Sequence, residues 1–381
     1  MGIYEWMKLP FETSCRINRE QRRWSGTIGF LLVLFTLWPK PLFSASGGQI
    51  VPVAPMNSAR AKHSATLLMD GTVLVAGGVG PDGKIIASAE VYDPRTLKFV
   101  PTGSMIQPRA GHNAVRLING TVLIIGGLGS QGPLDSCEIY DPATRKFFPT
   151  ANLHMPRAGA TATRLQDNRV LVVGGYAQEG LSLASAEVYN RNATFTLVAA
   201  MSTPRSFHTA TLLPHECVLI TGGIGTNEPL NSAELYNAEL NRFFPLPNLS
   251  VARARHKAVS LPDGNVLVLG GTSGRSHQGT PTTEIFDTEH RIFAAGAAMD
   301  KARLDFPEPS SLSGGKMLVV GGARIEEVYD PATKTFSADK GGMEHSRWYL
   351  GATALSEGKV LITGGADEKN RPTAEASMYV P

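Results

Sequence analysis

Cysteine is scarce in this chain, which excludes a fold that depends on several disulfide bonds. Only three cysteines occur among the 381 residues, and Cys15 lies in a leading segment outside the repeated part of the chain. Small secreted scaffolds held by disulfides are much richer in cysteine. Cys137 and Cys217 fall in separate units of the repeat, so we expect each to be buried among apolar side chains and no disulfide to join them.

The sequence also lacks a large excess of positive or negative charge. The formal net charge is +3, and residues 1–47 alone carry six basic and three acidic side chains, so residues 48–381 are close to neutral. The sequence shows no basic patch with interleaved aromatic residues. We therefore expect no binding of nucleic acid.

The sequence has no apolar run that makes a comfortable membrane span. The run at residues 26–38 has 13 residues, whereas a span needs about 20. Arginines precede it, and small residues such as Ser44 and Ala45 follow it. We predict that residues 1–47 form a secretory signal peptide, with an uncleaved N-terminal membrane anchor as the alternative. Residues 48–381 would then be secreted or periplasmic.

Sequence motifs of catalysis are missing as well. There is no nucleophile elbow, no paired-carboxylate motif and no closely spaced set of metal ligands. From the residues themselves we predict no catalytic residue, no metal site and no cofactor.

A repeat dominates what is present. Seven Gly-Gly dipeptides recur at the end of an apolar run, and the first five of these doublets are 48 or 49 residues apart. Each doublet closes a short apolar run, such as residues 73–76, which predicts a buried strand. Turn pairs such as Asp70-Gly71 precede several runs and predict a hairpin with an upstream strand. The doublets begin at Gly77, Gly126, Gly174, Gly222, Gly270, Gly321 and Gly364.

Two aromatic residues complete six of the seven units. In the first unit Tyr92 follows Gly77 by 15 residues, and Phe99 comes seven residues later. They predict two further strands, so one unit has four antiparallel strands. Such sheets bury both faces only by stacking around an axis, which predicts an all-β, seven-bladed β-propeller. The later pairs are Tyr140/Phe147, Tyr189/Phe195, Tyr236/Phe243, Phe286/Phe293 and Tyr329/Phe336.

The order of strand, Gly-Gly, Tyr and large aromatic resembles the kelch repeat, with Phe where that family usually has Trp. The resemblance covers residues 49–381 and implies one propeller domain over residues 48–381. The last unit ends at Pro381 without a fourth strand, and residues 49–54 have the form of that strand. We predict that they close the last blade and so remove a free sheet edge.

An arginine lies 17 or 18 residues before every doublet, and a glutamate recurs two residues before the aromatic at the Tyr position in six units. One hypothesis is a ring of guanidinium groups that binds carboxylate or phosphate at the channel mouth. The favoured hypothesis is a repeated, structural Arg–Glu pair. Ser377 replaces the glutamate in the last unit, so Arg347 is expected to lack this partner. The other arginines are Arg60, Arg109, Arg157, Arg205, Arg253 and Arg303, and the glutamates are Glu90, Glu138, Glu187, Glu234, Glu284 and Glu327.

Four units carry a histidine three residues after this arginine: His63, His112, His208 and His256. Because one histidine per blade is dispersed around the ring, we favour hydrogen-bonded structural histidines over a metal site.

The units differ most in blades 5–7. The loop after Gly270 is the longest, the loop after Gly321 is nearly missing, and Trp348 and Tyr349 adjoin Arg347. We predict an asymmetric groove there, since loops on a rigid scaffold concentrate binding residues. The candidate ligand-binding residues are Arg253, Arg275, His277, Arg303, His345, Arg347, Trp348 and Tyr349.

The kelch resemblance leaves function open, because kelch propellers include binding proteins and enzymes. Our leading hypothesis is a non-enzymatic, secreted or periplasmic module that binds a protein or glycan through the loop face. The alternative is a carbohydrate-active kelch enzyme. Sialic-acid mutarotases would suit an arginine-lined mouth but carry long insertions. Copper-radical oxidases of the galactose-oxidase type need a Cys–Tyr crosslink, a second Tyr and two His, for which no matching set is found. A module for surface assembly is a third hypothesis.

Overall fold

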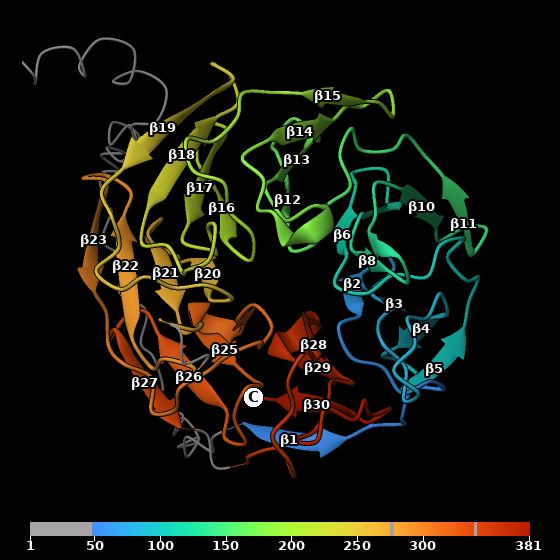
Figure 1. Cartoon of the computed structure of the whole chain (residues 1–381). Helices are drawn as coiled ribbons and strands as arrows, with labels where there is room; N and C mark the ends of the chain where they lie inside the picture. Colours follow the sequence, from blue (N-terminus) through green and yellow to red (C-terminus); the bar gives the residue numbers. More distant parts are fainter. Residues whose placement is uncertain (1–47, 275–277, 339–340) are drawn as a thin grey trace, which may run out of the picture.

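The computed structural model describes residues 48–274, 278–338 and 341–381. Seven four-stranded antiparallel sheets are arranged as blades around a central axis (Figure 1). The described residues contain no α-helix and only short 3-10 turns, at Gln178–Gly180, Ser313–Gly315 and Ser356–Gly358. The predicted seven-bladed propeller is therefore confirmed.

The blades follow the chain in order, each from its innermost to its outermost strand. Blade 1 consists of β2 (Ser64–Leu67), β3 (Val73–Ala76), β4 (Ala89–Asp93) and β5 (Lys98–Pro101). Blade 2 consists of β6 (Asn113–Arg116), β7 (Val122–Ile125), β10 (Cys137–Asp141) and β11 (Lys146–Pro149). The small pair β8 (Leu128–Gly129) and β9 (Gly132–Pro133) lies in the loop after β7. Blade 3 consists of β12 (Thr161–Arg164), β13 (Val170–Val173), β14 (Ala186–Tyr189) and β15 (Phe195–Leu197). Blade 4 consists of β16 (Thr209–Leu213), β17 (Cys217–Thr221), β18 (Ala233–Asn237) and β19 (Arg242–Leu246).

Blades 5–7 complete the ring. Blade 5 consists of β20 (Lys257–Ser260), β21 (Val266–Leu269), β22 (Thr283–Asp287) and β23 (Ile292–Ala295). Blade 6 has β24 (Ser310–Ser311), β25 (Met317–Val319), β26 (Glu327–Asp330) and β27 (Thr335–Ala338). Blade 7 has β28 (Gly351–Ala354), β29 (Val360–Thr363), β30 (Ala376–Val380) and, as its outer strand, β1 (Gln49–Pro52).

The predicted closure by the N-terminal strand is confirmed. Strand β1 pairs antiparallel with β30, with Gln49 opposite Val380 and Ile50 opposite Tyr379. Figure 1 shows this blue strand beside the red C-terminal strands. The first and last parts of the described chain are thus held in one sheet.

The apolar core lies between blades. Each of seven clusters draws on two neighbouring blades, and the cluster that closes the ring joins Val73 and Val75 of blade 1 to Leu361 and Met378 of blade 7. The second strand of each blade has no exposed face, which explains why its residues are mostly β-branched or leucine. The predicted aromatic pairs are cross-strand neighbours, as in Tyr92 and Phe99, whose ring centroids are 4.9 Å apart.

The glycine doublets are required by contact between blades. Gly77 and Gly78 have φ of 66° and 105°, in the left-handed region that favours glycine. A Cβ atom on Gly77 would also lie 2.5 Å from the carbonyl oxygen of Arg109, in the connection to the next blade. The doublet therefore lets each blade accept the chain that enters the following one.

The signal peptide or anchor at residues 1–47 lies outside the described residues and stays a prediction. Within the described part of the chain, no helix has the length and apolar character needed to cross a membrane. Cys137 is buried and free, so no disulfide joins it to Cys217.

Candidate ligand-binding site at the channel mouth

The repeated arginines do not face the channel. Arg109 is completely buried, and its guanidinium donates to the carbonyl oxygens of Gly126 and Ser136, both at 2.8 Å. It also pairs with Glu138 at 2.8 Å. Six blades repeat this ion pair with distances between 2.6 and 3.0 Å: Arg60–Glu90, Arg109–Glu138, Arg157–Glu187, Arg205–Glu234, Arg253–Glu284 and Arg303–Glu327. The structural Arg–Glu hypothesis is confirmed.

The glutamate of each pair holds a second segment of chain. Glu138 accepts hydrogen bonds from the backbone N–H groups of Ile106 and Gln107, at 2.7 and 3.0 Å. Its two oxygens are thus shared between the arginine and the connection that leads into the blade. The candidates Arg253 and Arg303 are wholly buried in such networks, so they have no surface to offer a ligand.

Arg347 in blade 7 departs from this arrangement, as its missing glutamate predicts. It donates to the carbonyl oxygens of Gly364 and Glu375 at 3.0 and 3.3 Å, but its ion pair with the Glu375 carboxylate is 3.9 Å long. Burial lowers the pKa of Arg347, against the opposing effect of Glu375 and Glu326. Arg347 is nevertheless buried like its counterparts and does not reach the mouth.

The four repeated histidines link neighbouring blades. Nε2 of His112 is hydrogen-bonded to the Ser64 hydroxyl at 2.8 Å, and Nε2 of His208 to the Thr161 hydroxyl at 2.9 Å. Burial, and then the nearby arginines, lower the pKa of each of these two histidines to about 3. These neutral, hydrogen-bonded rings confirm a structural role.

The position two residues after each repeated arginine forms a ring around the channel. All seven residues there have φ between 51° and 60°. This left-handed conformation suits glycine and strains large side chains, aromatic ones in particular. We call this set the mouth ring: Lys62, Gly111, Gly159, Phe207, Arg255, Asp305 and Tyr349.

Backbone hydrogen bonds join members of the mouth ring directly from blade to blade. The N–H of Lys62 donates to the carbonyl of Tyr349 at 3.0 Å, which connects blade 1 to blade 7. The N–H of Tyr349 donates in turn to Asp305 at 2.8 Å. Equivalent bonds run from Gly111 to Lys62, from Phe207 to Gly159 and from Arg255 to Phe207. The ring backbone is therefore a common support for five different side chains and two glycines.

Those side chains form one contact network over blades 4–7 and 1. The Arg255 guanidinium lies 4.4 Å from the centre of the Phe207 ring and pairs with Asp305 at 3.0 Å. The Lys62 ammonium lies 4.5 Å from the centre of the Tyr349 ring. Burial and the neighbouring Asp305 raise the pKa of Tyr349 to about 12, so its hydroxyl stays protonated at neutral pH. A Cβ atom on Gly111 would meet no atom within 4 Å, whereas one on Gly159 would lie 3.0 Å from the Phe207 ring.

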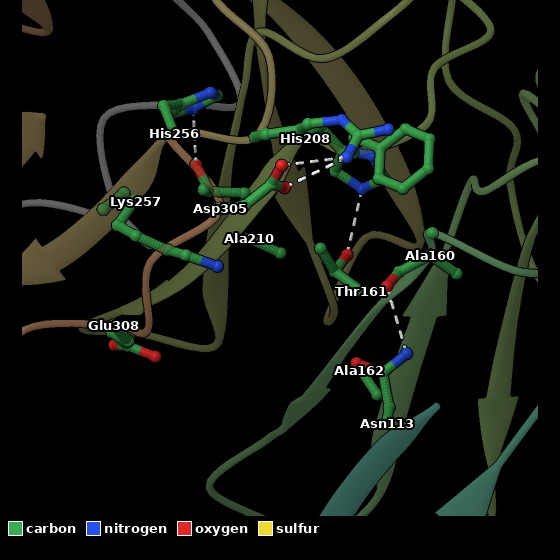
Figure 2. A pocket seen from close by; sticks show the side chains of 15 residues that line it. Asn113, Ala160, Thr161, Ala162, His208, Ala210, His256, Lys257, Asp305 and Glu308 are labelled. Atoms are coloured by element: carbon green, nitrogen blue, oxygen red, sulfur yellow. Dashed lines mark hydrogen bonds and ion pairs between the residues drawn. The ribbon is translucent and has the colours of Figure 1, made fainter. Parts of the chain in front are cut away.

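Three hollows adjoin this network. The first, about 400 Å³, lies across the mouth and touches all seven blades, with Lys62, Tyr176 and Tyr349 among its lining residues. A second of about 400 Å³ lies between Ile224, Gly274, Leu304 and Tyr349. The third, about 320 Å³, lies between the inner strands (Figure 2). We call the third one the channel chamber; it is lined by Asn113, Thr161, His208, Lys257 and Glu308, among others.

Of the eight candidate residues, Tyr349 alone lies in the mouth ring. Trp348 is half-buried, and its backbone forms a bridge with Ala366. His345 is exposed beside Glu344, at 3.6 Å. Arg275 and His277 lie outside the described residues. The predicted groove over blades 5–7 corresponds in part to the second hollow, which these blades line together with blade 4.

The described residues do not fit the copper centre that the oxidase alternative needs. Within the described ranges, no group of three or more His, Cys, Asp or Glu side chains is placed to hold a metal ion. Cys137 is packed in the core between blades 2 and 3, and burial raises the pKa of its thiol to about 12. Nε2 of each repeated histidine is already hydrogen-bonded to a hydroxyl of the preceding blade.

Comparison with known proteins agrees with the repeat. The Kelch motif family matches residues 60–106 and 108–153, which correspond to blades 1 and 2. No curated protein sequence matches the chain. Among solved structures, the chain is similar to a novel fungal alcohol oxidase "with catalytic diversity among the AA5 family, in complex with copper". The TM-score is 0.73, with 16% identity over 88% of this chain and 77% of that chain. Likeness at this identity shows the fold alone.

Proposed function

The chain is a kelch-repeat β-propeller, and on that premise we propose that it is a binding module that holds the end of a glycan in the mouth of its central channel. The predicted signal peptide suggests that it acts outside the cytosol. The mouth ring carries this proposal. Non-glycine residues in the left-handed region cost about 1–3 kcal/mol each and cluster at functional sites.

Five of the seven ring positions bear such residues, although blades 2 and 3 show that glycine serves the fold equally well there. The five side chains differ in chemistry, whereas a purely structural position would repeat one residue, as the buried arginines do. The retained backbone strain therefore supports the view that these five side chains were selected for the ligand that they contact above the channel.

The size and composition of the mouth favour a sugar. A hollow of about 400 Å³ falls in the range of small-ligand pockets. A stable protein partner would need about 800 Å² of its own surface in contact. The half-buried rings of Tyr176, Phe207 and Tyr349 suit the apolar C–H faces of a sugar. Lys62, Arg255 and Asp305 offer hydrogen bonds to its hydroxyl groups.

The variant Tyr349→Gly tests this proposal on a glycan array. It removes a ring side chain together with its backbone strain, at φ of 56°. We expect at least ten-fold weaker glycan binding, while the free energy of unfolding changes by less than about 1 kcal/mol. Lys334→Gly is the matched control, because Lys334 has the same φ of 56° in the outer hairpin between β26 and β27.

Equal binding by the wild type and Tyr349→Gly would remove the mouth ring from the site. A chain that binds no glycan but binds a protein independently of Tyr349 would refute the glycan proposal itself. Loss of binding in Lys334→Gly would point to a general effect of glycine substitution instead of the loss of a contact at the mouth.

A further inference from the structure

Two charged residues interrupt the inner wall of the channel in adjacent blades. Five residues after the repeated arginine, six blades have alanine and blade 6 has Glu308. One position earlier, the blades have small or uncharged residues, except that blade 5 has Lys257. The alanines are Ala65, Ala114, Ala162, Ala210, Ala258 and Ala352, and the uncharged residues are Ser64, Asn113, Thr161, Thr209, Pro307 and Gly351.

Both side chains line the channel chamber. Figure 2 shows Lys257 and Glu308 together, across the chamber from Thr161 and Asn113. Neither the Lys257 ammonium nor the Glu308 carboxylate has a hydrogen bond or an ion pair with another residue that the structure describes; their mutual effect is electrostatic only. They therefore differ from the repeated Arg–Glu pairs, in which the guanidinium and the carboxylate are bonded to each other.

The setting of these two groups opposes their charge. Desolvation inside the channel lowers the pKa of Lys257 and raises that of Glu308, although Glu308 is open to solvent on the channel side. A charged group that is desolvated without a bonded partner costs stability. Alanine and threonine serve the same strand positions elsewhere, so the fold has no need of this pair.

The Lys257 ammonium lines the chamber without a bonded partner among the described residues. Asp305 already pairs with Arg255 at 3.0 Å. His208 and His256 are held neutral, because burial lowers their pKa values far below neutral pH. Lys257 and Glu308 are the remaining charged groups that line the chamber, and burial opposes the charge of both. An anion that enters the chamber can therefore pair with the Lys257 ammonium, which no carboxylate bonds within the described part of the chain.

We propose that the channel chamber is a subsite for the carboxylate of an acidic sugar, with Lys257 as its ion-pair partner. The inference rests on the glycan-binding function proposed above and names the chemical class of the sugar. Short polar side chains around the chamber, Asn113, Thr161 and Thr209, suit a hydroxylated ligand, and the alanines leave room for it. Glu308 would hydrogen-bond a sugar hydroxyl.

Ligand-observed NMR on the full-length chain tests the subsite with D-glucuronate and, as its neutral counterpart, D-glucose. We expect glucuronate to bind at least ten-fold more tightly than glucose. Lys257→Thr, which installs the residue of blades 3 and 4, should reduce glucuronate affinity to that of glucose without lowering the melting temperature. Lys257→Arg keeps the charge and should retain the preference for glucuronate.

Each other outcome overturns the inference. Equal glucuronate binding by the wild type and Lys257→Thr would exclude Lys257 as the carboxylate partner. Binding of neutral glycans without any preference for glucuronate would refute the subsite and leave the mouth proposal intact, whereas failure of all sugars would refute both. A peptide with a free C-terminal carboxylate is the last probe. If it binds through Lys257, and its amidated form and glucuronate do not bind, the ligand of the subsite is a peptide C-terminus and not an acidic sugar.

Discussion

At the scale of the residue, the buried Arg109–Glu138 pair gives the clearest prediction for stability. Arg109→Met leaves the Glu138 carboxylate buried without its cation, although two backbone N–H groups still bond it. Removing one partner of a buried pair costs about 3–5 kcal/mol. We expect a loss of this size in urea unfolding.

The control for Arg109→Met is Arg95→Met. Arg95 pairs with Asp93 at 3.0 Å, but its side chain is 79% exposed. Surface pairs contribute little, so the midpoint of unfolding should hardly move. If both variants unfold at the same urea concentration, the repeated pair does not owe its contribution to stability to its burial.

The buried histidines predict how stability depends on pH. The pKa of His208 is about 3 in the folded chain and about 6.5 when unfolded. Between these values the unfolded state binds more protons, so the free energy of unfolding falls as pH falls below about 6.5. His208→Ala should remove about one proton from this dependence, measured as the slope of unfolding free energy between pH 6 and 5. An unchanged slope would mean that His208 is protonated in the folded protein.

At the scale of the element, β1 has the greatest leverage because it supplies the outer strand of blade 7. Its deletion would expose the edge of β30 and the side chain of Tyr379, which is now buried. Removing residues 49–54 should lower the melting temperature by about 5 °C or more, since a few kcal/mol are lost. Calorimetry of the full chain with and without these residues measures this. Equal melting temperatures would show that the ring does not depend on the closing strand.

The elements were largely predictable from sequence, whereas the site was not. The step from Gly77 to Tyr92 and Phe99 reports strand pairing, because Tyr92 lies opposite Val73 on one side and Phe99 on the other. The aromatic pair recurs in blades 2–6. Ring positions such as Phe207 and Asp305 share no chemistry, only a backbone conformation. The glycines at two of these positions, Gly111 and Gly159, were the feature of the sequence that indicated this left-handed backbone conformation. Tyr349 was singled out as an aromatic neighbour of Arg347, not as a member of a ring.

At the scale of the whole molecule, seven similar blades act as internal references for one another. A residue that recurs, such as the buried arginine, serves the fold, and its pairing bears this out. A residue that departs from the repeat is informative where it has no bonded partner in the described ranges, as with Lys257 and Glu308. Substituting the residue that the other blades carry at such a position should abolish ligand binding and raise the free energy of unfolding.

Lys257→Thr makes this expectation measurable without any ligand. The substitution replaces a desolvated ammonium on β20 by the residue found on β12 and β16, and β-branched threonine suits a strand. We expect the free energy of unfolding to rise by roughly 0.5–2 kcal/mol, as for other changes toward a consensus. Lys98→Thr, on the exposed outer strand β5, is the matched control and should have little effect. Destabilisation by Lys257→Thr would instead mean that the lysine supports the channel wall, and its departure from the repeat would then be structural.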